Sequence, residues 1–446
     1  MKSKTSLRRL LCLVLLSATL LVLSLGLCGC TAEMAPKDEI LAATLELDGA
    51  SEKYDYVGSY LSDLGYEGFD KVKFRRIELY FASYYIKELP KAAEMAKLTS
   101  TYFLENLYDS TDLSDRTALT DGLIRCYVAS TGDKYAFYRN EQEYEDYETD
   151  MSGVFVGIGV TVNLSEENEI RVIEVLEGSG AKDAGILVDD LIIGVDGVSY
   201  TEVEYEAFVN LIRGEEGSTV EVTVLRGEET LTFTVTRKRL VESTVSYAVN
   251  DDGIGYLHIS RFKGNTAEQF GEALEALKEA GVKGIVFDLR NNPGGYLNSV
   301  VDVLEYFVKE GVRIVSYKFA GQDETVFYSE TSVTFDLPCT VLCNGGTASA
   351  GELFCAALRD FRDMGLINAR IIGETTYKKG VMQNTFTFSD SSALTMTVAY
   401  YNPPSNVNYD SVGVVPDVEC PLPEDAESDV QLETAVRELE AMILAK

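Results

Sequence analysis

The chain has 446 residues, of which 46% are hydrophobic and 25% charged, and its formal net charge at pH 7 is −33. This length allows two or three domains with substantial cores, and the composition is that of a globular protein. A strongly negative surface repels nucleic acids and anionic lipid headgroups, so we expect no polynucleotide partner and no electrostatic attachment to a membrane.

The N-terminus, residues 1–29, has the pattern of a targeting segment. Basic residues within 2–9 precede an apolar run over 10–27, which is typical of a secretory signal. The run ends in Leu-Cys-Gly-Cys (27–30), which resembles the end of a bacterial lipoprotein signal, and Cys30 would then carry the lipid. The resemblance implies an extracytoplasmic protein that is lipid-anchored at a bacterial cell membrane. An uncleaved transmembrane helix and an ordinary signal with chance cysteines remain alternatives.

Residues 38 to about 146 have the apolar spacing of helices, as at Leu104, Leu107 and Leu119. The part over 30–96 contains seven tyrosines, which we interpret as the core and rim of a helical packing layer rather than as a binding stripe. We leave this extension unassigned.

From Gly153 to about Leu240 the pattern changes to short strands and a helix. This pattern resembles a PDZ domain. In such a domain the N–H groups of the loop Gly157-Ile158-Gly159 would capture the carboxylate of a C-terminal peptide, which adds as a strand beside the chain that begins at Val160. Alternatively, the glycines simply turn the chain. The expected elements are a strand that opens at 157–160, strands over 170–176 and 190–195, a helix over 202–212, and a hairpin of 220–225 with 230–236.

The run Asn-Gly-Gly-Thr-Ala-Ser-Ala (344–350) follows an apolar strand and precedes a helix predicted over 350–358, which places Ser349 at a strand-to-helix junction. Free N–H groups and the positive end of the helix dipole at such a junction would stabilise an oxyanion. The alternative interpretation makes Ser349 an ordinary helix N-cap.

Downstream, an extended segment over 379–388 would place Lys379 and Gln383 on one face and direct both side chains at one site. A lysine accepts a serine proton only when it is neutral, which requires burial that lowers its pKa. Lys378 is a competing candidate for this base. In the non-catalytic interpretation, the Lys-Lys-Gly step is simply a solvated end of a strand.

A serine–histidine pair is nearly excluded, because the chain has a single histidine. The single histidine, His258, lies in an alternating segment over 254–260 and is interpreted as a packed strand residue. Of the eight cysteines, three lie in or at the end of the targeting segment, and the others are expected mostly as buried free thiols without a disulfide. Because no Cys-x-x-Cys pair accompanies the histidine, we expect no metal site and no cofactor.

A third segment, 285–295, is an apolar strand that ends in Pro-Gly-Gly, where paired glycines let backbone N–H groups approach a ligand closely. Together the three segments resemble the C-terminal processing peptidases, serine proteases with a Ser–Lys dyad, over about residues 97–440. The resemblance implies Ser349 as the nucleophile, Lys379 as the general base and Gln383 as the residue that orients the lysine.

The resemblance also implies an oxyanion hole. Its donors would be the backbone N–H groups of Ala350 and of a glycine in the Asn-Pro-Gly-Gly turn, for which we favour Gly295 over Gly294. Two departures from the family pattern are Lys378, where glycine is usual, and Gly351, where serine is common.

The expected fold is multidomain, with α+β and α/β parts: N-terminal helices, a PDZ-like β-rich module and a crotonase-like α/β peptidase core. Short connections on both sides of the PDZ module predict that its orientation is coupled to the core. The expected divisions are a lipoprotein signal peptide over 1–29, a helical extension over 30–96, an N-terminal helical segment of the peptidase over 97–150, the PDZ domain over 151–240, and the peptidase core with a C-terminal helix over 241–446.

The expected function is that of a membrane-anchored serine endopeptidase that cleaves proteins near their C-terminus. Its PDZ module would recognise protein or peptide substrates with unstructured, apolar C-termini. Two other functions fit the same residues: a non-catalytic PDZ scaffold lipoprotein, and a Ser–Lys hydrolase of non-peptide amides or esters. The oligomeric state is left open.

Overall fold

The expected targeting segment, Cys30 and most of the helix expected over 202–212 lie outside the part of the chain that the structure describes. Within the described part, no helix is long and apolar enough to cross a membrane. The structure is a computed structural model that describes residues 34–47, 53–165, 169–202, 208, 211–332, 335–423, 426 and 428–445.

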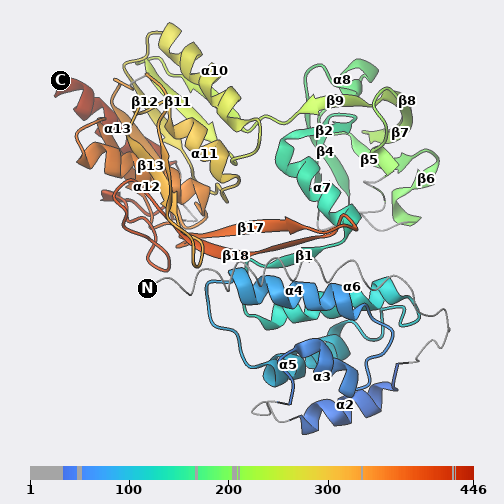
Figure 1. The fold of residues 1–446 in the computed structure, drawn as a ribbon. Coiled ribbons are helices and arrows are strands. Elements are labelled where there is room, and N and C mark those ends of the chain that lie inside the picture. The colour runs from blue at the N-terminus through green and yellow to red at the C-terminus, as the bar shows by residue number, and fades with distance from the viewer. Residues whose placement is uncertain are drawn as a thin grey trace, which may run out of the picture. The chain divides into compact units, whose positions relative to one another are not determined.

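The chain forms two compact units, and the first of them is helical (Figure 1). Tyr66 is fully buried there and packs edge-on against Phe103, with ring centroids 5.6 Å apart, so this tyrosine is a core residue as expected. The boundary expected between residues 96 and 97 falls inside α5, and buried residues on both sides of it belong to the same unit. The unit comprises Met1–Glu78 and Pro90–Thr131, with the helices α2 (Lys37–Glu46), α3 (Val57–Asp63), most of α4 (Lys71–Tyr84), α5 (Ala92–Asn106) and α6 (Arg116–Ser130).

The second unit comprises Leu79–Leu89 and Gly132–Lys446, and it begins with a strand that the sequence analysis did not predict. β1 (Phe137–Arg139) interrupts the helical pattern expected over 38–146 and pairs antiparallel with β18 (Ala393–Asn402). The expectation was wrong here because pairing with a strand far away in the chain overrides a local helical pattern. The helical pattern resumes in α7 (Glu141–Ser152).

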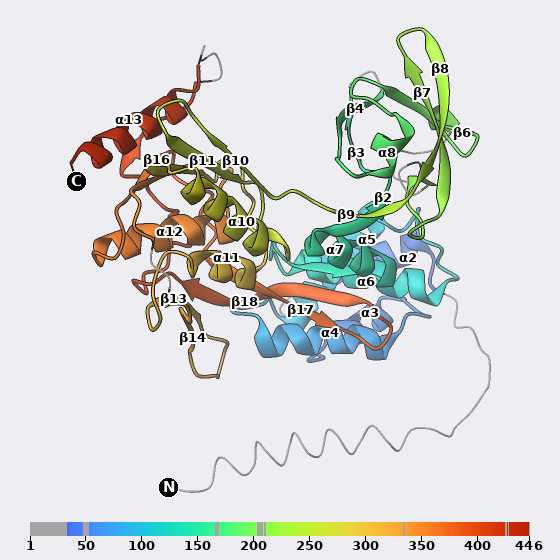
Figure 2. The ribbon, with the colours of Figure 1, turned by 90° about the horizontal axis from the view of Figure 1, so that it is seen from above.

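The expected PDZ module is a β-rich body built on antiparallel strands (Figure 2). Its main sheet has the order β3-β4-β5-β7-β8 with β6 paired to β5, and β2 and β9 form a separate ribbon. Val172, Ile192 and Val222 fill its core. The elements are β2 (Val154–Gly157), β3 (Val160–Leu164), β4 (Ile170–Val175), α8 (Gly180–Ala184), β5 (Leu191–Val195), β6 (Val198–Ser199), a 3-10 turn η2 (Tyr200–Glu202), β7 (Thr219–Arg226), β8 (Glu229–Thr236) and β9 (Lys238–Val241).

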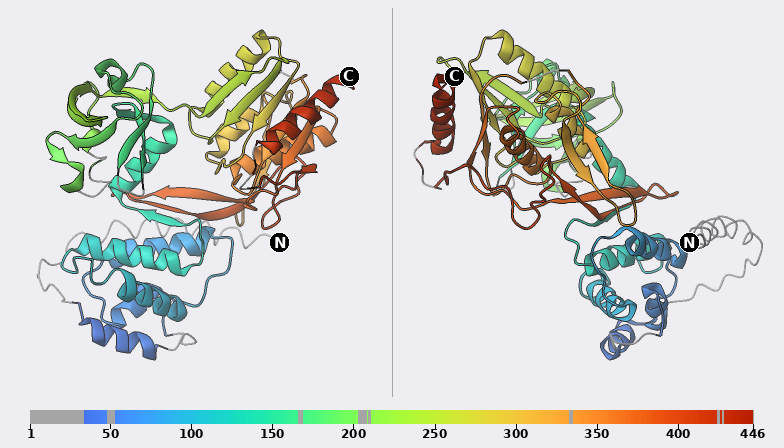
Figure 3. Two further views of the ribbon diagram at one scale, coloured as in Figure 1. Left: turned by 180° about the vertical axis from the view of Figure 1, so that it is seen from behind. Right: turned by 60° about the vertical axis from the view of Figure 1, so that its left-hand side comes forward.

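The remaining chain is a mixed α/β core whose main sheet has the order β10-β11-β12-β15-β16-β19, parallel except at β10. Phe287 and Val341 face α10, α11 and α12 in a large apolar cluster. Val286 and Leu342, the alternate residues, pack with residues of α13 in a second cluster. This helix, drawn in dark red at the C-terminus in Figure 3, covers the opposite face of the sheet. Successive side chains of a strand point to opposite faces, and both faces are buried here, as in a parallel sheet that is covered by helices on both sides. The elements are β10 (Val245–Val249), β11 (Ile254–Ile259), α10 (Thr266–Glu279), β12 (Gly284–Asp288), α11 (Leu297–Leu304), β15 (Cys339–Cys343), α12 (Ala350–Asp363), β16 (Ala369–Gly373), β19 (Val418–Glu419) and α13 (Val430–Leu444).

A second sheet of the core carries the long hairpin of β17 (Val381–Thr387) and β18. β18 pairs with β17 and β1 and, near its end, with β13 (Arg313–Tyr317), which in turn pairs with β14 (Thr325–Tyr328). A β-bulge interrupts the pairing of β17 and β18 between Met382 and Gln383. This sheet brings β17 and its preceding loop to the end of β15, where the candidate site lies.

Candidate active site

Ser349 lies at the sharp turn between β15 and α12. Its backbone has φ 54° and ψ −116°, a conformation that is strained for a residue other than glycine. The turn is held by hydrogen bonds from Ala348 N to Asn292 O (2.8 Å) and from Thr347 Oγ1 to Leu289 O (2.7 Å). A strained serine between a strand and a helix, fixed by its surroundings, is the arrangement that exposes a nucleophilic hydroxyl.

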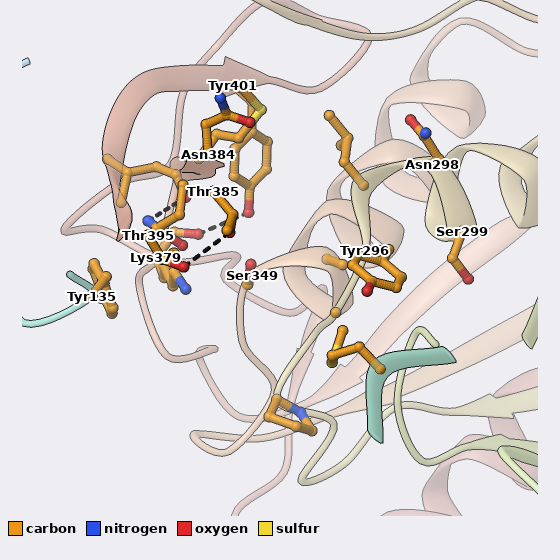
Figure 4. A pocket seen from close by; sticks show the side chains of 18 of the residues that line it. Tyr135, Tyr296, Asn298, Ser299, Ser349, Lys379, Asn384, Thr385, Thr395 and Tyr401 are labelled. Atoms are coloured by element: carbon orange, nitrogen blue, oxygen red, sulfur yellow. Dashed lines mark hydrogen bonds between the residues drawn. The ribbon is translucent and has the colours of Figure 1, made fainter. Parts of the chain in front are cut away.

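A cavity of about 840 Å³ extends from this turn. All five residues expected to act in catalysis line it: Gly295, Ser349, Ala350, Lys379 and Gln383. In Figure 4 the side chains of Ser349 and Lys379 are directed toward the same space. Segments far apart in the sequence therefore meet at one cavity.

The lysine in this cavity is Lys379. Its Nζ lies 4.2 Å from the centroid of the Tyr135 ring. Burial lowers its pKa to about 8, although the negative charges of Asp133 and Glu352 act in the opposite direction. Among the described residues, no hydrogen bond joins Lys379 Nζ to Ser349 Oγ. Lys378 has an exposed side chain and does not line the cavity.

We expect peptide cleavage to rise with pH and to reach half of its maximal rate near pH 8, because only the neutral amine of Lys379 accepts a proton and its pKa is about 8. The measurement is kcat/KM for a short peptide between pH 5.5 and 10, with stability checked at each pH. An activity maximum below pH 6 would contradict a lysine base and indicate a carboxylate.

Gln383 is held by a chain of hydrogen bonds. Its Nε2 donates to Thr397 Oγ1 (3.2 Å), and Thr397 Oγ1 donates to Asp133 Oδ1 (3.0 Å). Asp133 Oδ2 also accepts the Thr397 N–H at 2.9 Å. Because its amide nitrogen is engaged in this way, Gln383 presents its Oε1 as an acceptor. Within the described residues, no hydrogen bond joins Gln383 to Lys379.

The Pro-Gly-Gly turn lies against the nucleophile. A Cβ added to Gly294 would lie 2.7 Å from Ser349 Cβ. The Gly294 N–H donates to Asn292 Oδ1 at 2.8 Å, whereas the N–H groups of Gly295 and Ala350 have no partner in the part of the chain that is described. Two free N–H groups beside a serine are what an oxyanion hole requires. The geometry therefore favours Gly295 over Gly294 as the second donor.

Glu352 is a positioning residue that the sequence analysis missed. Its fully buried carboxylate accepts the N–H groups of Ser349 (2.9 Å), Lys378 (2.7 Å) and Lys379 (2.8 Å) and the hydroxyl of Thr376 (2.5 Å). It thus joins the turn of the serine to the loop of the lysine. Part of this role could be predicted from the sequence, since Ser-x-x-Glu at a helix start is the capping-box pattern. The contacts of Glu352 with the loop of the lysine could not, because no local sequence pattern encodes them.

The predicted peptide-binding loop turns between β2 and β3. The Ile158 side chain is buried in the module core, Gly159 has φ 82°, and the carbonyls of these two residues accept N–H groups of Ala181 and Leu176. Val160 begins β3, which is the end strand of its sheet. The outer edge of β3 therefore has no strand partner among the described residues, as strand addition by a peptide requires.

Comparison with known proteins yields one family. A model of peptidase family S41 matches residues 253–420, and a model of the PDZ domain matches residues 149–225. The carboxy-terminal processing protease CtpA of Bacillus subtilis is 31% identical over 314 residues, which are 70% of this chain and 66% of that protein. The carboxyl-terminal-processing protease of Synechocystis is 30% identical over 322 residues, 69% of this chain and 74% of that protein.

Among solved structures, the photosystem II D1 C-terminal processing protease is 26% identical, covers 82% of this chain and 96% of its own, and gives a TM-score of 0.45. The curated relatives match this chain over roughly 60 to 75% of their own length. By its matches to the family and domain models and by its 30% identity to the Synechocystis protease, the chain belongs to peptidase family S41, among the carboxyl-terminal processing proteases that carry a PDZ domain.

Proposed function

We propose that this protein is a serine endopeptidase that cleaves proteins near their C-terminus, with Ser349 as nucleophile and Lys379 as general base. The observation that carries the proposal is the meeting of three features at one cavity. These are a strained serine, a lysine whose pKa is lowered to about 8, and two N–H groups without partners among the described residues. The names of the similar proteins, carboxy-terminal processing proteases, support the same reaction.

The proposed reaction proceeds through an acyl-enzyme. Neutral Lys379 Nζ accepts the proton of Ser349 Oγ while the oxygen attacks the scissile carbonyl. The N–H groups of Gly295 and Ala350 bind the oxyanion that forms. The ammonium of Lys379 then returns the proton to the leaving amine, the C–N bond breaks, and a water that Lys379 deprotonates releases the acid product and restores Ser349.

The proposed substrates have unstructured, apolar C-termini. Several aromatic side chains line the cavity beyond the serine, among them Tyr296, Tyr317, Phe327 and Tyr401, and such a lining suits apolar side chains of an extended peptide. The free edge of β3 and the neighbouring glycine loop support capture of a C-terminal strand by the PDZ module. If the core had no catalytic activity, the same PDZ module would make the protein a scaffold. If the cavity bound other substrates, the same dyad would make it a hydrolase of non-peptide amides or esters.

The test is digestion of a random-coil protein that ends in an apolar tail, with sequencing of the products from wild-type protein and from Ser349→Ala. We expect internal cleavage near the tail, slower cleavage when the terminal carboxylate is amidated, and no cleavage by Ser349→Ala. Binding of the tail without any product would support the scaffold instead. Turnover of ester substrates alone would support the non-peptide hydrolase.

We also propose that the protein is lipid-anchored through Cys30 on the extracytoplasmic face of a bacterial membrane. The support is the lipoprotein-like pattern over 27–30 together with a net charge of −33, which offers no basic attraction to anionic lipid. Two acyl chains supply the anchoring that such a surface does not.

We expect Cys30→Ser to lose fatty-acid label and to move from the membrane fraction to a soluble or uncleaved form. Metabolic labelling with a radioactive fatty acid, followed by fractionation, measures both effects. Cys28→Ser is the matched control and should keep the label. Label retained in Cys30→Ser would show that another residue is modified.

A further inference from the structure

A buried lysine joins the two connections of the PDZ module to the peptidase core. Lys263 is 2% exposed, and its Nζ donates to Asp150 Oδ1 at 2.8 Å and to Glu242 Oε2 at 2.7 Å. Asp150 lies near the end of α7, just before the module, and Glu242 directly follows β9, the last strand of the module. One ammonium group therefore holds both places where the chain passes between module and core.

Further hydrogen bonds reinforce this junction. The Gly264 N–H donates to Met151 O at 3.0 Å. Asn265 Nδ2 donates to Gly153 O (3.2 Å) and to Glu242 O (2.8 Å). Since the same short segment contacts the chain before β2 and after β9, a change in the orientation of the module would move residues 263–265.

The same segment also shapes the oxyanion turn. Phe262 N donates to Gly294 O at 2.9 Å, and Tyr296 N donates to Phe262 O at 2.8 Å. A Cβ on Gly295 would overlap with Phe262 O, so this backbone contact is as close as glycine permits. Phe262 itself is fully buried. The direction of the Gly295 N–H is therefore set by the residue next to Lys263.

We propose that Lys263 is a positioning residue that couples the orientation of the PDZ module to the oxyanion turn. The inference rests on the proposed function, because it assigns the Gly295 N–H a part in catalysis. The coupling path is short: the carboxylates of Asp150 and Glu242, the ammonium of Lys263, the backbone of Phe262, and the turn at Gly295. Lys263 is not among the described residues that line the cavity, and it acts through the adjacent backbone of Phe262.

The decisive variant is Lys263→Met. The side chains of Asp150 and Glu242 are 52% and 40% exposed, and Asp150 keeps its ion pair with Arg261 at 3.3 Å. Both carboxylates can therefore be solvated by water, and the fold is expected to persist. Lys263→Arg keeps the charge and should recover part of the coupling if the first variant folds poorly. Lys283→Met is the matched control, since Lys283 is an exposed lysine of the same core whose Nζ donates to the backbone carbonyl of Asp252.

Two measurements separate positioning from general damage. The first is kcat and KM for a short unstructured peptide, with and without a peptide that ends in an apolar residue with a free carboxylate. We expect Lys263→Met to lower kcat about tenfold or more with little change in KM, as loss of oxyanion alignment does. We also expect that the peptide with the apolar C-terminus no longer changes kcat of this variant. The second measurement compares binding of a peptide aldehyde, whose serine adduct carries an oxyanion, with binding of the matching uncleavable amide. Only binding of the aldehyde should become weaker.

The proposal would be overturned if Lys263→Met weakened binding of the aldehyde and of the amide equally. It would also be overturned if kcat fell only in proportion to the fraction of folded protein. A Lys263→Met protein that behaves as wild type, or a Lys283→Met protein that loses as much activity, would overturn it as well. Other results would contradict the proposed function itself: a wild-type protein that does not cleave peptides, or a Ser349→Ala protein that retains cleavage.

Discussion

Ser349→Ala and Lys379→Met should each abolish peptide cleavage while the protein stays folded. Loss of either the nucleophile or the proton acceptor stops acyl transfer, and the expected fall in kcat is roughly four to six orders of magnitude. Because the two residues act as one unit, the double variant should be no slower than either single variant. The measurement is single-turnover cleavage of a short peptide, with circular dichroism to confirm folding.

The matched control for the lysine is Lys378→Met. Lys378 is adjacent in sequence but its side chain is exposed, so this variant should retain most of the activity. An essential Lys378 with a dispensable Lys379 would show that the assignment of the base is wrong by one residue.

Glu352→Gln should have the next largest effect. The carboxylate accepts four hydrogen bonds, from the turn of the serine and from the loop of the lysine, and an amide in its place turns two donor hydrogens toward buried donors. Each donor left unpaired costs about 1–3 kcal/mol, and both segments should shift. Since a displacement of about 1 Å lowers a rate about 100-fold, we expect kcat to fall by roughly that factor or more.

The control for this prediction is Glu78→Gln in the first unit. Glu78 is also buried and accepts a backbone N–H, that of Val57 at 2.6 Å, so its replacement should reduce stability without changing kcat of the folded protein. Thermal unfolding and kcat are measured for both variants. Equal kcat in Glu352→Gln and wild type would show that the bridge between serine turn and lysine loop is not needed for catalysis.

Local patterns predicted most of the core. The continuous apolar runs of β12 and β15, the turn signal before Ser349 and the helix that follows are all encoded within a few residues, so they could be read from the sequence. The strand β1 could not, because its partner β18 lies far away in the chain and its three residues carry no strand pattern of their own.

The candidate site shows the same division between local and distant information. The sequence placed Lys379 on an extended segment, but its burial and lowered pKa depend on packing that the sequence does not display. The bulge before Gln383, the chain from Gln383 through Thr397 to Asp133, and the contacts of Glu352 all join segments that are distant in sequence. These contacts are therefore visible only in the structure.

The most direct test of the Ser349–Lys379 pair is reaction with a fluorophosphonate, which phosphonylates an activated serine hydroxyl. The wild-type protein and the Lys379→Met and Lys378→Met variants are treated at pH 9, digested, and searched by mass spectrometry for the adduct. We expect an adduct on Ser349 in wild type and in Lys378→Met, and none in Lys379→Met. A folded wild-type protein whose Ser349 stays unmodified, or a Lys379→Met protein labelled at the wild-type rate, would contradict a dyad of these two residues.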